Sequence, residues 1–202
     1  DTSGLIVVAK TEVCANSLIA QFKSRHVKKF YLALCKGNPL ENLSKIVSKP
    51  GVNILEDNCI EVKTYIRRNK NNREIMEINT DNGKIAISRF SVQTVYELGK
   101  NKKLSLVGCE IETGRTHQNR VHAKLIGCPI FGDTLYKLRR KEDFIMEKTI
   151  LSSFKLMRLR QMLHAHELSF AHPKSGQRIF LRGELSPDFL NLLSNLEKYK
   201  TS

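Results

Sequence analysis

The densest group of polar side chains in this sequence lies in one short stretch, Gly114 to His122, which reads G-R-T-H-Q-N-R-V-H. Each buried polar group without a partner costs about 1–3 kcal/mol, so this many on one element indicate a site. At helical spacing, Thr116, Arg120 and Lys124 form one row, and the start of a helix behind a tight glycine turn can bind a phosphate. A solvated amphipathic helix is the alternative interpretation.

Tyr31 is the second candidate, because it lies in the alternating run K-K-F-Y-L-A-L at residues 28–34. An aromatic ring can stack on an unpaired base in RNA recognition. An ordinary strand aromatic explains the same pattern, and both interpretations stay open at this point.

Other chemistries lack the residues that they need. His117 and His122 are five apart, and His164 and His166 are two apart, so neither pair has the i, i+4 spacing that suits zinc on a helix. Ser3 is not in a G-x-S-x-G elbow, and the glycine-rich nucleotide loops are missing. We therefore expect no metal site, and neither a serine hydrolase nor a nucleotide-loop protein.

The charge of the chain indicates a polyanionic partner. It has 202 residues with 34 Lys and Arg against 20 Asp and Glu, a formal net charge of +14. Lys and Arg that reach phosphates release condensed counterions, although charge alone leaves RNA, DNA, anionic lipid and plain solubility open. No apolar run approaches the ~18 residues of a membrane span, and we expect none. The five cysteines are widely spaced without a C-x-x-C, which favours reduced, buried thiols.

Hydrophobic periodicity and turn residues predict the elements that must position these groups. The N-terminal part is expected to contain a buried strand at 5–9, a helix from an N-cap at Thr11 to about Arg25 with Val13, Leu18 and Phe22 on its apolar side, a strand at 28–34, and short strands joined by polar loops over 38–82. The C-terminal part is expected to begin with a meander of strands at 84–89, 91–98 and 104–112, followed by a helix at 116–126 ended by Gly127. A charged insertion at 137–155 and strands at 163–170 and 178–182 come next. The last expected element is a helix after Ser186 with Leu190, Leu193 and Leu196 on its apolar face. Strands dominate without regular β–α alternation, which predicts one α+β domain built on a mixed, largely antiparallel sheet with flanking helices and loops.

Six strings, taken in order, resemble the RluA-like family of pseudouridine synthases. They are D-T-S-G-L with V-V-A-K-T behind it from Asp1, K-F-Y-L-A from Lys29, T-G-R-T-H-Q-x-R-V-H from Thr113, G-C-P-I-F-G-D-x-x-Y from Gly127, L-H-A from Leu163, and L-x-F-x-H-P from Leu168. They span nearly the whole chain. One departure is Asn119, where the family usually has an apolar residue.

The resemblance implies a role for several residues. Tyr31 would stack on the flipped uracil and assist proton removal from C5, and Arg120 would pair with the catalytic aspartate. In the family that aspartate belongs to an H-R-L-D-x-x string before T-S-G, so it is expected two places before Asp1 and Asp1 itself does not take its role. The RNA-binding candidates are Arg115, His117, Gln118, Lys29 and Lys28.

The resemblance also predicts the wider organisation. Residues 1–202 would form the synthase catalytic domain without its N-terminal strands and catalytic-Asp motif, and any S4-like RNA-binding domain would lie upstream. The expected partner is RNA, with large-subunit ribosomal RNA as substrate, no cofactor or metal, and a monomer in the cytoplasm. The expected basic surface is Lys28, Lys29, Arg67, Arg68, Arg139, Arg140 and Lys141. A non-catalytic RNA-binding protein on the same scaffold is the alternative.

Overall fold

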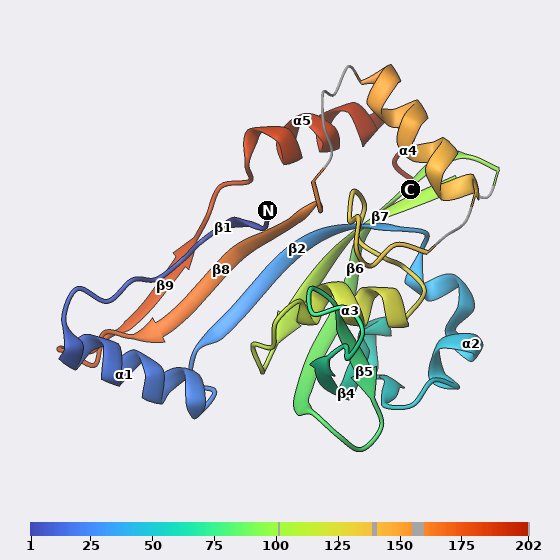
Figure 1. Cartoon of the computed structure of the whole chain (residues 1–202). Helices are drawn as coiled ribbons and strands as arrows, with labels where there is room; N and C mark the ends of the chain where they lie inside the picture. The colour runs from blue at the N-terminus through green and yellow to red at the C-terminus, as the bar shows by residue number, and fades with distance from the viewer. Residues whose placement is uncertain (101, 139–140, 155–159, 202) are drawn as a thin grey trace.

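The fold is built on one large, mostly antiparallel sheet (Figure 1). The computed structural model describes residues 1–100, 102–138, 141–154 and 160–201, without the side chains of residues 42 and 141–143. Its strands are β1 (Ser3–Gly4), β2 (Lys28–Lys36), β3 (Val52–Ile54), β4 (Ile60–Arg68), β5 (Met76–Asn79), β6 (Lys84–Gly99), β7 (Lys102–Ile111), β8 (Leu163–Ala171) and β9 (Arg178–Arg182). The helices are α1 (Glu12–Lys23), α2 (Leu43–Val47), α3 (Gln118–Leu125), α4 (Lys141–Ser153) and α5 (Pro187–Leu196), with short 3-10 turns η1 (Pro39–Asn42), η2 (Glu56–Asn58) and η3 (Glu197–Tyr199).

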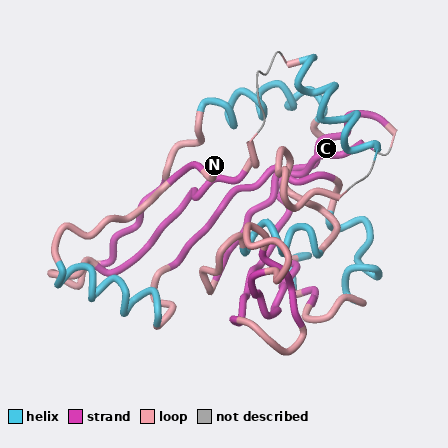
Figure 2. The backbone as a smooth tube through the Cα atoms, viewed as in Figure 1, coloured by secondary structure: helices cyan, strands magenta, loops and turns pink. Residues whose placement is uncertain are grey.

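The strands follow the order β1-β8-β2-β7-β6-β4-β3, with β5 paired to β4 and β9 paired to β8. Among the described strands only the β1–β8 pairing is parallel. Figure 2 shows the strands in the middle of the molecule and most helices around them. This arrangement confirms the predicted α+β class with a largely antiparallel sheet.

The centre of the sheet is buried on both faces, because successive side chains of a strand point to opposite sides. On β2, Ala33 and Cys35 join the core cluster under α3, whereas Leu34 joins the cluster under α4 and α5. The near-continuous apolar run L-A-L-C is therefore typical of a strand that is covered twice.

Helix α3 carries most of the polar motif, and its ends are well defined. It begins after His117, whose backbone is left-handed with φ 58°, and ends before Gly127 with φ 80°. The N–H of Cys128 donates to the Ala123 carbonyl, which is the Schellman closure that a glycine after the last turn permits. The predicted helix and its glycine stop are confirmed, with a start two residues later.

The predicted apolar side of α1 is only partly correct. The Thr11 Oγ1 accepts the Cys14 N–H at 3.3 Å, as expected for an N-cap. Leu18 is buried, but Val13 is 76% exposed and Phe22 is 40% exposed. The helix packs mainly against the end of β8, which needs only a narrow apolar stripe.

The predicted face of α5 is shifted along the helix. Phe189, Leu192 and Leu196 are buried, whereas Leu190 is 47% exposed. The run F-L-N-L-L contains two overlapping apolar rows, and the larger Phe189 side chain takes the place against the sheet.

Three other local predictions were wrong. Residues 5–9 are not a strand, because pairing with β8 stops at Gly4. The runs at 84–89 and 91–98 form the single strand β6. The region 38–82 contains the predicted strands joined by loops, as β3, β4 and β5, and in addition the helix α2. The charged insertion contains α4, which buries Met146 and Ile150 against α5. No helix in the described part of the chain is long and apolar enough to cross a membrane.

Candidate functional site

Gln118 fastens the loop between β7 and α3 to the sheet. Its Nε2 donates to the Ile87 carbonyl and the Ser88 Oγ, each at 2.9 Å. Its Oε1 accepts from Thr113 Oγ1 at 2.7 Å and from the Arg115 N–H at 3.0 Å. These four bonds use the whole buried amide, so the geometry favours a positioning role for Gln118.

Two cations lie together at this loop. Lys29 is only 9% exposed, and its Nζ donates to the Thr113 carbonyl at 3.3 Å. Burial lowers the pKa of Lys29, and the nearby Arg115 charge lowers it further. Arg115 is itself anchored by an Nε hydrogen bond to the Ile85 carbonyl at 2.8 Å. No acidic residue in the described part of the chain pairs with either cation, and two adjacent cations favour binding of an anion.

Tyr31 follows Lys29 by two residues on β2 and therefore points to the same face of the sheet. The pairing between β2 and β8 shifts register between Phe30 and Tyr31, so His166 of β8 is left without a partner residue on β2. Such bulges are common beside active sites, where they redirect a side chain. Burial raises the pKa of Tyr31, and no described residue hydrogen-bonds its hydroxyl. A neutral phenol with an unused hydroxyl can stack on a base and exchange a proton with it.

Arg120 forms a buried bidentate ion pair. Its Nε lies 2.6 Å from Asp133 Oδ2 and its Nη2 lies 2.8 Å from Oδ1, with the side chains 7% and 0% exposed. The guanidinium also lies over the Tyr136 ring at 4.9 Å. The predicted row of Thr116, Arg120 and Lys124 is therefore wrong: Thr116 precedes the helix, and Arg120 is turned inward.

The two histidines of the motif both form hydrogen bonds within the framework. Tyr136 accepts the Met76 N–H at 2.7 Å and bonds His117 Nδ1 at 2.8 Å, while burial and Arg120 lower the pKa of His117. His122 bonds hydroxyl groups on β4 and β6, each at 2.9 Å, and burial lowers its pKa to about 3. His122 therefore fixes α3 to the sheet, and His117 fixes the start of α3 to the segment that holds Tyr136.

The structure brings the predicted site residues into two groups. Lys29, Arg115 and Gln118 share the loop before α3, and His117 and Arg120 both contact Tyr136. Among the described residues no hydrogen bond or ion pair joins these groups to Tyr31.

The remaining residues of the predicted basic surface do not form one cluster in the described part of the chain. Lys28 is exposed at the start of β2, and Arg67 pairs with Glu77 at 2.8 Å. Arg139 and Arg140 lie outside the described residues, as does the side chain of Lys141.

Asn119 is buried and its Oδ1 has no partner among the described residues. A buried polar atom without a partner is costly, which agrees with the expectation that an apolar residue suits this position better.

Sequence reasoning missed Arg160, which ties the N-terminal residues to the rest of the fold. Its guanidinium donates to the Asp1 carbonyl at 2.9 Å, to Ser3 Oγ at 2.9 Å and to Ser186 Oγ at 2.8 Å, and it pairs with Asp188 at 2.7 Å. These partners are far apart in the chain, and no local pattern around Arg160 points to them. The role of Asp133 was missed for the same reason.

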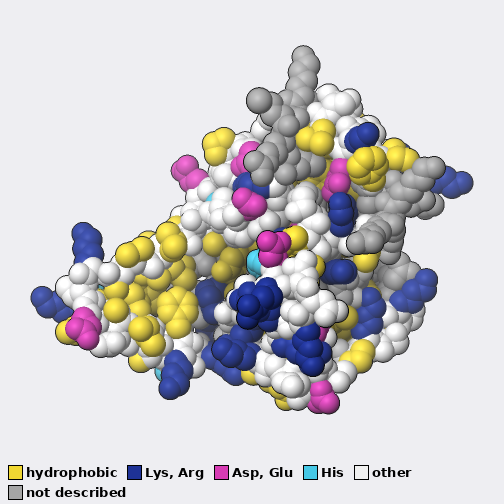
Figure 3. All heavy atoms as spheres, in the orientation of Figure 1, with side chains coloured by type: hydrophobic (Ala, Val, Ile, Leu, Met, Phe, Trp, Pro, Cys, Tyr) yellow, Lys and Arg dark blue, Asp and Glu magenta, His cyan; other side chains and the backbone are white. Residues whose placement is uncertain are grey.

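The surface separates apolar and basic regions. Figure 3 shows hydrophobic side chains gathered over the part of the molecule that contains α1, and Lys and Arg side chains gathered over the part around α3. Ile6, Val8, Val13 and Ile19 are all more than half exposed on the apolar region. The Lys and Arg side chains in this view thus lie over the part of the molecule where α3 is seen, apart from the apolar region (Figures 1 and 3).

A family model described as RNA pseudouridylate synthase matches residues 1–125, which include β1, Tyr31 and the whole of α3. The chain belongs to this family. The predicted resemblance to pseudouridine synthases is confirmed.

Named relatives of this family match nearly all of the chain. Ribosomal large subunit pseudouridine synthase D of Neisseria meningitidis is 35% identical over 196 residues, which cover 97% of this chain and 46% of that protein. Ribosomal large subunit pseudouridine synthase C of Buchnera aphidicola is 34% identical over 196 residues, with 97% and 54% covered. The chain thus spans about half the length of these curated relatives.

The synthase fold is also found among solved structures. Human RNA pseudouridylate synthase domain containing 1 matches with a TM-score of 0.60 at 23% identity, covering 94% of this chain and 74% of that chain. Human RNA pseudouridylate synthase domain containing 4 matches with a TM-score of 0.59 at 20% identity, covering 95% and 70%. These likenesses confirm the predicted fold.

Proposed function

We propose that the protein isomerises specific uridines to pseudouridine in RNA, with large-subunit ribosomal RNA as the substrate. The family match over residues 1–125 carries this proposal. The names of the relatives from Neisseria meningitidis and Buchnera aphidicola support the choice of RNA.

The reaction is an internal rearrangement. The N1–C1′ bond of the uridine breaks, the base turns, and C5 bonds to C1′; the C5 proton leaves and N1 takes up a proton. Nothing is oxidised or hydrolysed overall, so the proposal includes neither a cofactor nor a metal. The target base must leave its stack, at a cost of a few kcal/mol that is smaller in loops.

Tyr31 is proposed to hold the flipped base. Its ring offers a stacking face, and its hydroxyl has no protein partner among the described residues. Lys29 and Arg115, on the same side of the loop before α3, are proposed to bind phosphates next to the target, with Lys28 and His117 at the rim. Gln118 is proposed to keep that loop in place.

Arg120 is proposed to orient the catalytic carboxylate that is expected two places before Asp1. The ion pair with Asp133 uses Nε and Nη2 of Arg120, and no described residue bonds its Nη1. A guanidinium has five N–H donors, so a second carboxylate can still bind. Arg160 supports the same arrangement, because it holds the backbone carbonyl of Asp1.

The wider organisation follows the same proposal. Residues 1–202 act as one catalytic domain that continues upstream into the aspartate motif, with any S4-like domain beyond it. We propose that the protein works as a monomer in the cytoplasm. Light scattering of the purified full-length protein and fractionation of cells test these two statements.

The test uses the full-length protein and ribosomal RNA labelled with tritium at C5 of uridine, because formation of pseudouridine releases that tritium. Tyr31→Phe keeps the stacking ring and removes the hydroxyl, so we expect turnover to fall about 10²–10⁴-fold with RNA affinity changed less than about threefold. Tyr65→Phe, on the exposed side of β4, is the matched control and should keep full turnover. Absence of tritium release by the unaltered protein on every ribosomal RNA would overturn the proposal in favour of an RNA-binding protein without catalysis.

A further inference from the structure

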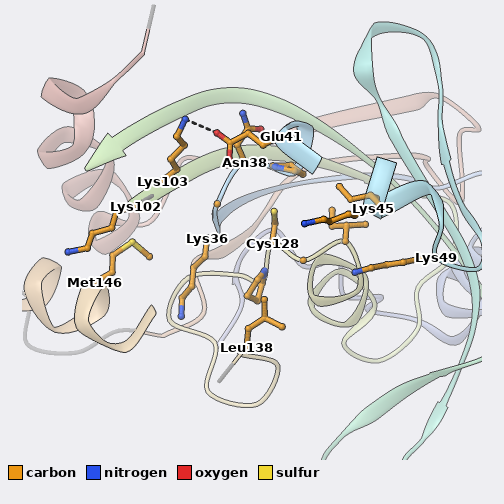
Figure 4. Close-up of a pocket in the computed structure, with 16 residues that line it drawn as sticks. Lys36, Asn38, Glu41, Lys45, Lys49, Lys102, Lys103, Cys128, Leu138 and Met146 are labelled. Atoms are coloured by element: carbon orange, nitrogen blue, oxygen red, sulfur yellow. Dashed lines mark ion pairs between the residues drawn. The ribbon is translucent and has the colours of Figure 1, made fainter. Parts of the chain in front are cut away.

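A large hollow lies at the opposite end of β2 from Lys29. Its volume is about 810 Å³, and its walls come from the end of β2, the segment of η1 and α2, the start of β7, and the residues that follow α3. Figure 4 shows the side chains that line it. The residues assigned to the proposed catalytic site do not line this hollow.

The walls carry an excess of positive charge. Five lysines line the hollow, against one acidic residue, Glu41. They are Lys36, Lys45, Lys49, Lys102 and Lys103. Charges of one sign in a concave site focus the field and raise the local concentration of counter-ions.

Two of these lysines are neutralised by the protein. Lys36 is buried and pairs with Glu147 of α4 at 2.6 Å. Lys103 bonds Glu41 at 2.6 Å and also pairs with Glu97, and these carboxylates raise the pKa of Lys103 to about 12. Both lysines belong to the framework of the hollow.

The other three lysines line the hollow without an acidic partner among the described residues. No carboxylate pairs with Lys45, Lys49 or Lys102 in the described part of the chain, although Lys49 donates to the Leu125 carbonyl. Figure 4 shows Lys45 and Lys49 extending from the α2 side toward Cys128, with Lys102 on the other side near Met146. The three positive charges are thus spread around the hollow, and each can attract an anion there.

We propose that this lysine-lined hollow binds phosphate groups of the RNA backbone at a distance from the target uridine. The inference rests on the proposed function for the identity of the ligand. Tyr31 and Lys36 are five residues apart on β2, which corresponds to about 17 Å at the rise of a strand. That is roughly five nucleotides of a stacked strand, so one RNA loop can reach both places.

The form of the hollow fits a backbone better than a single small anion. Lys45 and Lys49 both extend toward Cys128, whereas the Lys102 nitrogen points away from them, so the available charges do not converge on one point (Figure 4). Lysine acts as a point charge, without the planar fork with which arginine grips one phosphate. Successive phosphates along a strand suit such a spread of charges.

The test compares RNA affinity over a range of salt concentrations by fluorescence anisotropy. The double variant Lys45→Gln/Lys102→Gln removes two of the available charges, and Lys174→Gln/Lys198→Gln removes two exposed charges that do not line the hollow. For single-stranded contacts we expect the slope of log K against log salt to fall by about 1.4, with roughly 25-fold weaker binding at 0.1 M salt, in the first variant alone.

Two further measurements separate the possible outcomes. A trinucleotide centred on the target uridine is too short to reach the hollow, so its binding should be equal in both double variants. Equal salt slopes for the two double variants on a long RNA loop would overturn the proposal. Stabilisation of the unaltered protein by millimolar pyrophosphate, lost in Lys45→Gln/Lys102→Gln while RNA affinity stays unchanged, would assign the hollow to a free phosphorylated molecule and overturn it too.

Failure of this proposal can be distinguished from failure of the proposed function. Tritium release at saturating RNA should be the same in Lys45→Gln/Lys102→Gln as in the unaltered protein, because these lysines lie outside the catalytic groups. If the protein binds RNA through the hollow but never releases tritium, the inference about the hollow stands and only the proposed isomerisation is overturned.

Discussion

The Asp133→Asn substitution isolates the buried charge that holds Arg120. In the native protein, Asp133 Oδ1 accepts from Arg120 Nη2 and from the N–H groups of Leu135 and Tyr136, at 2.8–3.0 Å. An asparagine keeps this oxygen but places an NH₂ group where Oδ2 now lies 2.6 Å from Arg120 Nε. The change therefore sets donor against donor and leaves a buried cation without its counter-ion, while the turn bonds are kept.

The expected loss of stability is large because neither side chain is exposed to solvent. Removal of one partner from a buried ion pair costs about 3–5 kcal/mol. In a chain of this size that corresponds to a fall of about 6–20 °C in Tm. Urea unfolding followed by circular dichroism suits a protein without tryptophan and gives the free energy of unfolding directly.

Asp188→Asn is the matched control. Asp188 pairs with the Nε of Arg160 at 2.7 Å, almost the same geometry, but its side chain is 45% exposed. Exposed pairs contribute about 1 kcal/mol or less, so this variant should lose little. Equal losses in Asp133→Asn and Asp188→Asn would refute the reasoning, because burial would then not decide the strength of the pair.

Three other predictions concern the framework of the site. Burial lowers the pKa of His122 to about 3 in the folded protein, whereas its pKa in the unfolded chain is about 6.5. As the pH falls from 7 to 5, only the unfolded chain takes up a proton at this residue, so the free energy of unfolding should fall by about 2 kcal/mol. His122→Gln should remove this fall, which urea titrations at the two pH values measure. Gly4 has a φ of +107°, and a Cβ at this position would lie 2.2 Å from the Ala165 carbonyl oxygen. Gly4→Ala should therefore abolish the hydrogen-exchange protection of the β1 edge. Gly176→Ala is the control, because a Cβ there meets open space, and it should leave that edge protected. Arg160→Gln should lower the hydrogen-exchange protection of the Leu5 N–H, which donates to the Ala165 carbonyl at 2.9 Å, and unchanged protection would show that the bonds of Arg160 to Asp1 and Ser3 do not hold this segment.

Several elements could be predicted because their signals are local. Strand β2 and helix α3 follow from alternation and from the glycine stop at Gly127, and the i, i+2 spacing puts Lys29 and Tyr31 on one face. The faces of α1 and α5 could not be predicted as well, because each has more apolar residues than one face needs. Which row becomes buried depends on the width of the sheet surface that the helix covers.

The sequence by itself determined which residue types can do chemistry and where most strands lie. Both signals are local, because a motif such as T-G-R-T-H-Q-x-R-V-H and the alternation of apolar and polar residues in a strand involve neighbouring residues. Only the tertiary structure decided which charges meet. It paired Arg120 with Asp133, joined Arg160 to Ser3, and brought the lysines of α2 and β7 around one hollow. These contacts join residues that are far apart in the chain, and they form because packing of the two faces of the sheet excludes water and leaves each buried charge only the partners that the fold supplies.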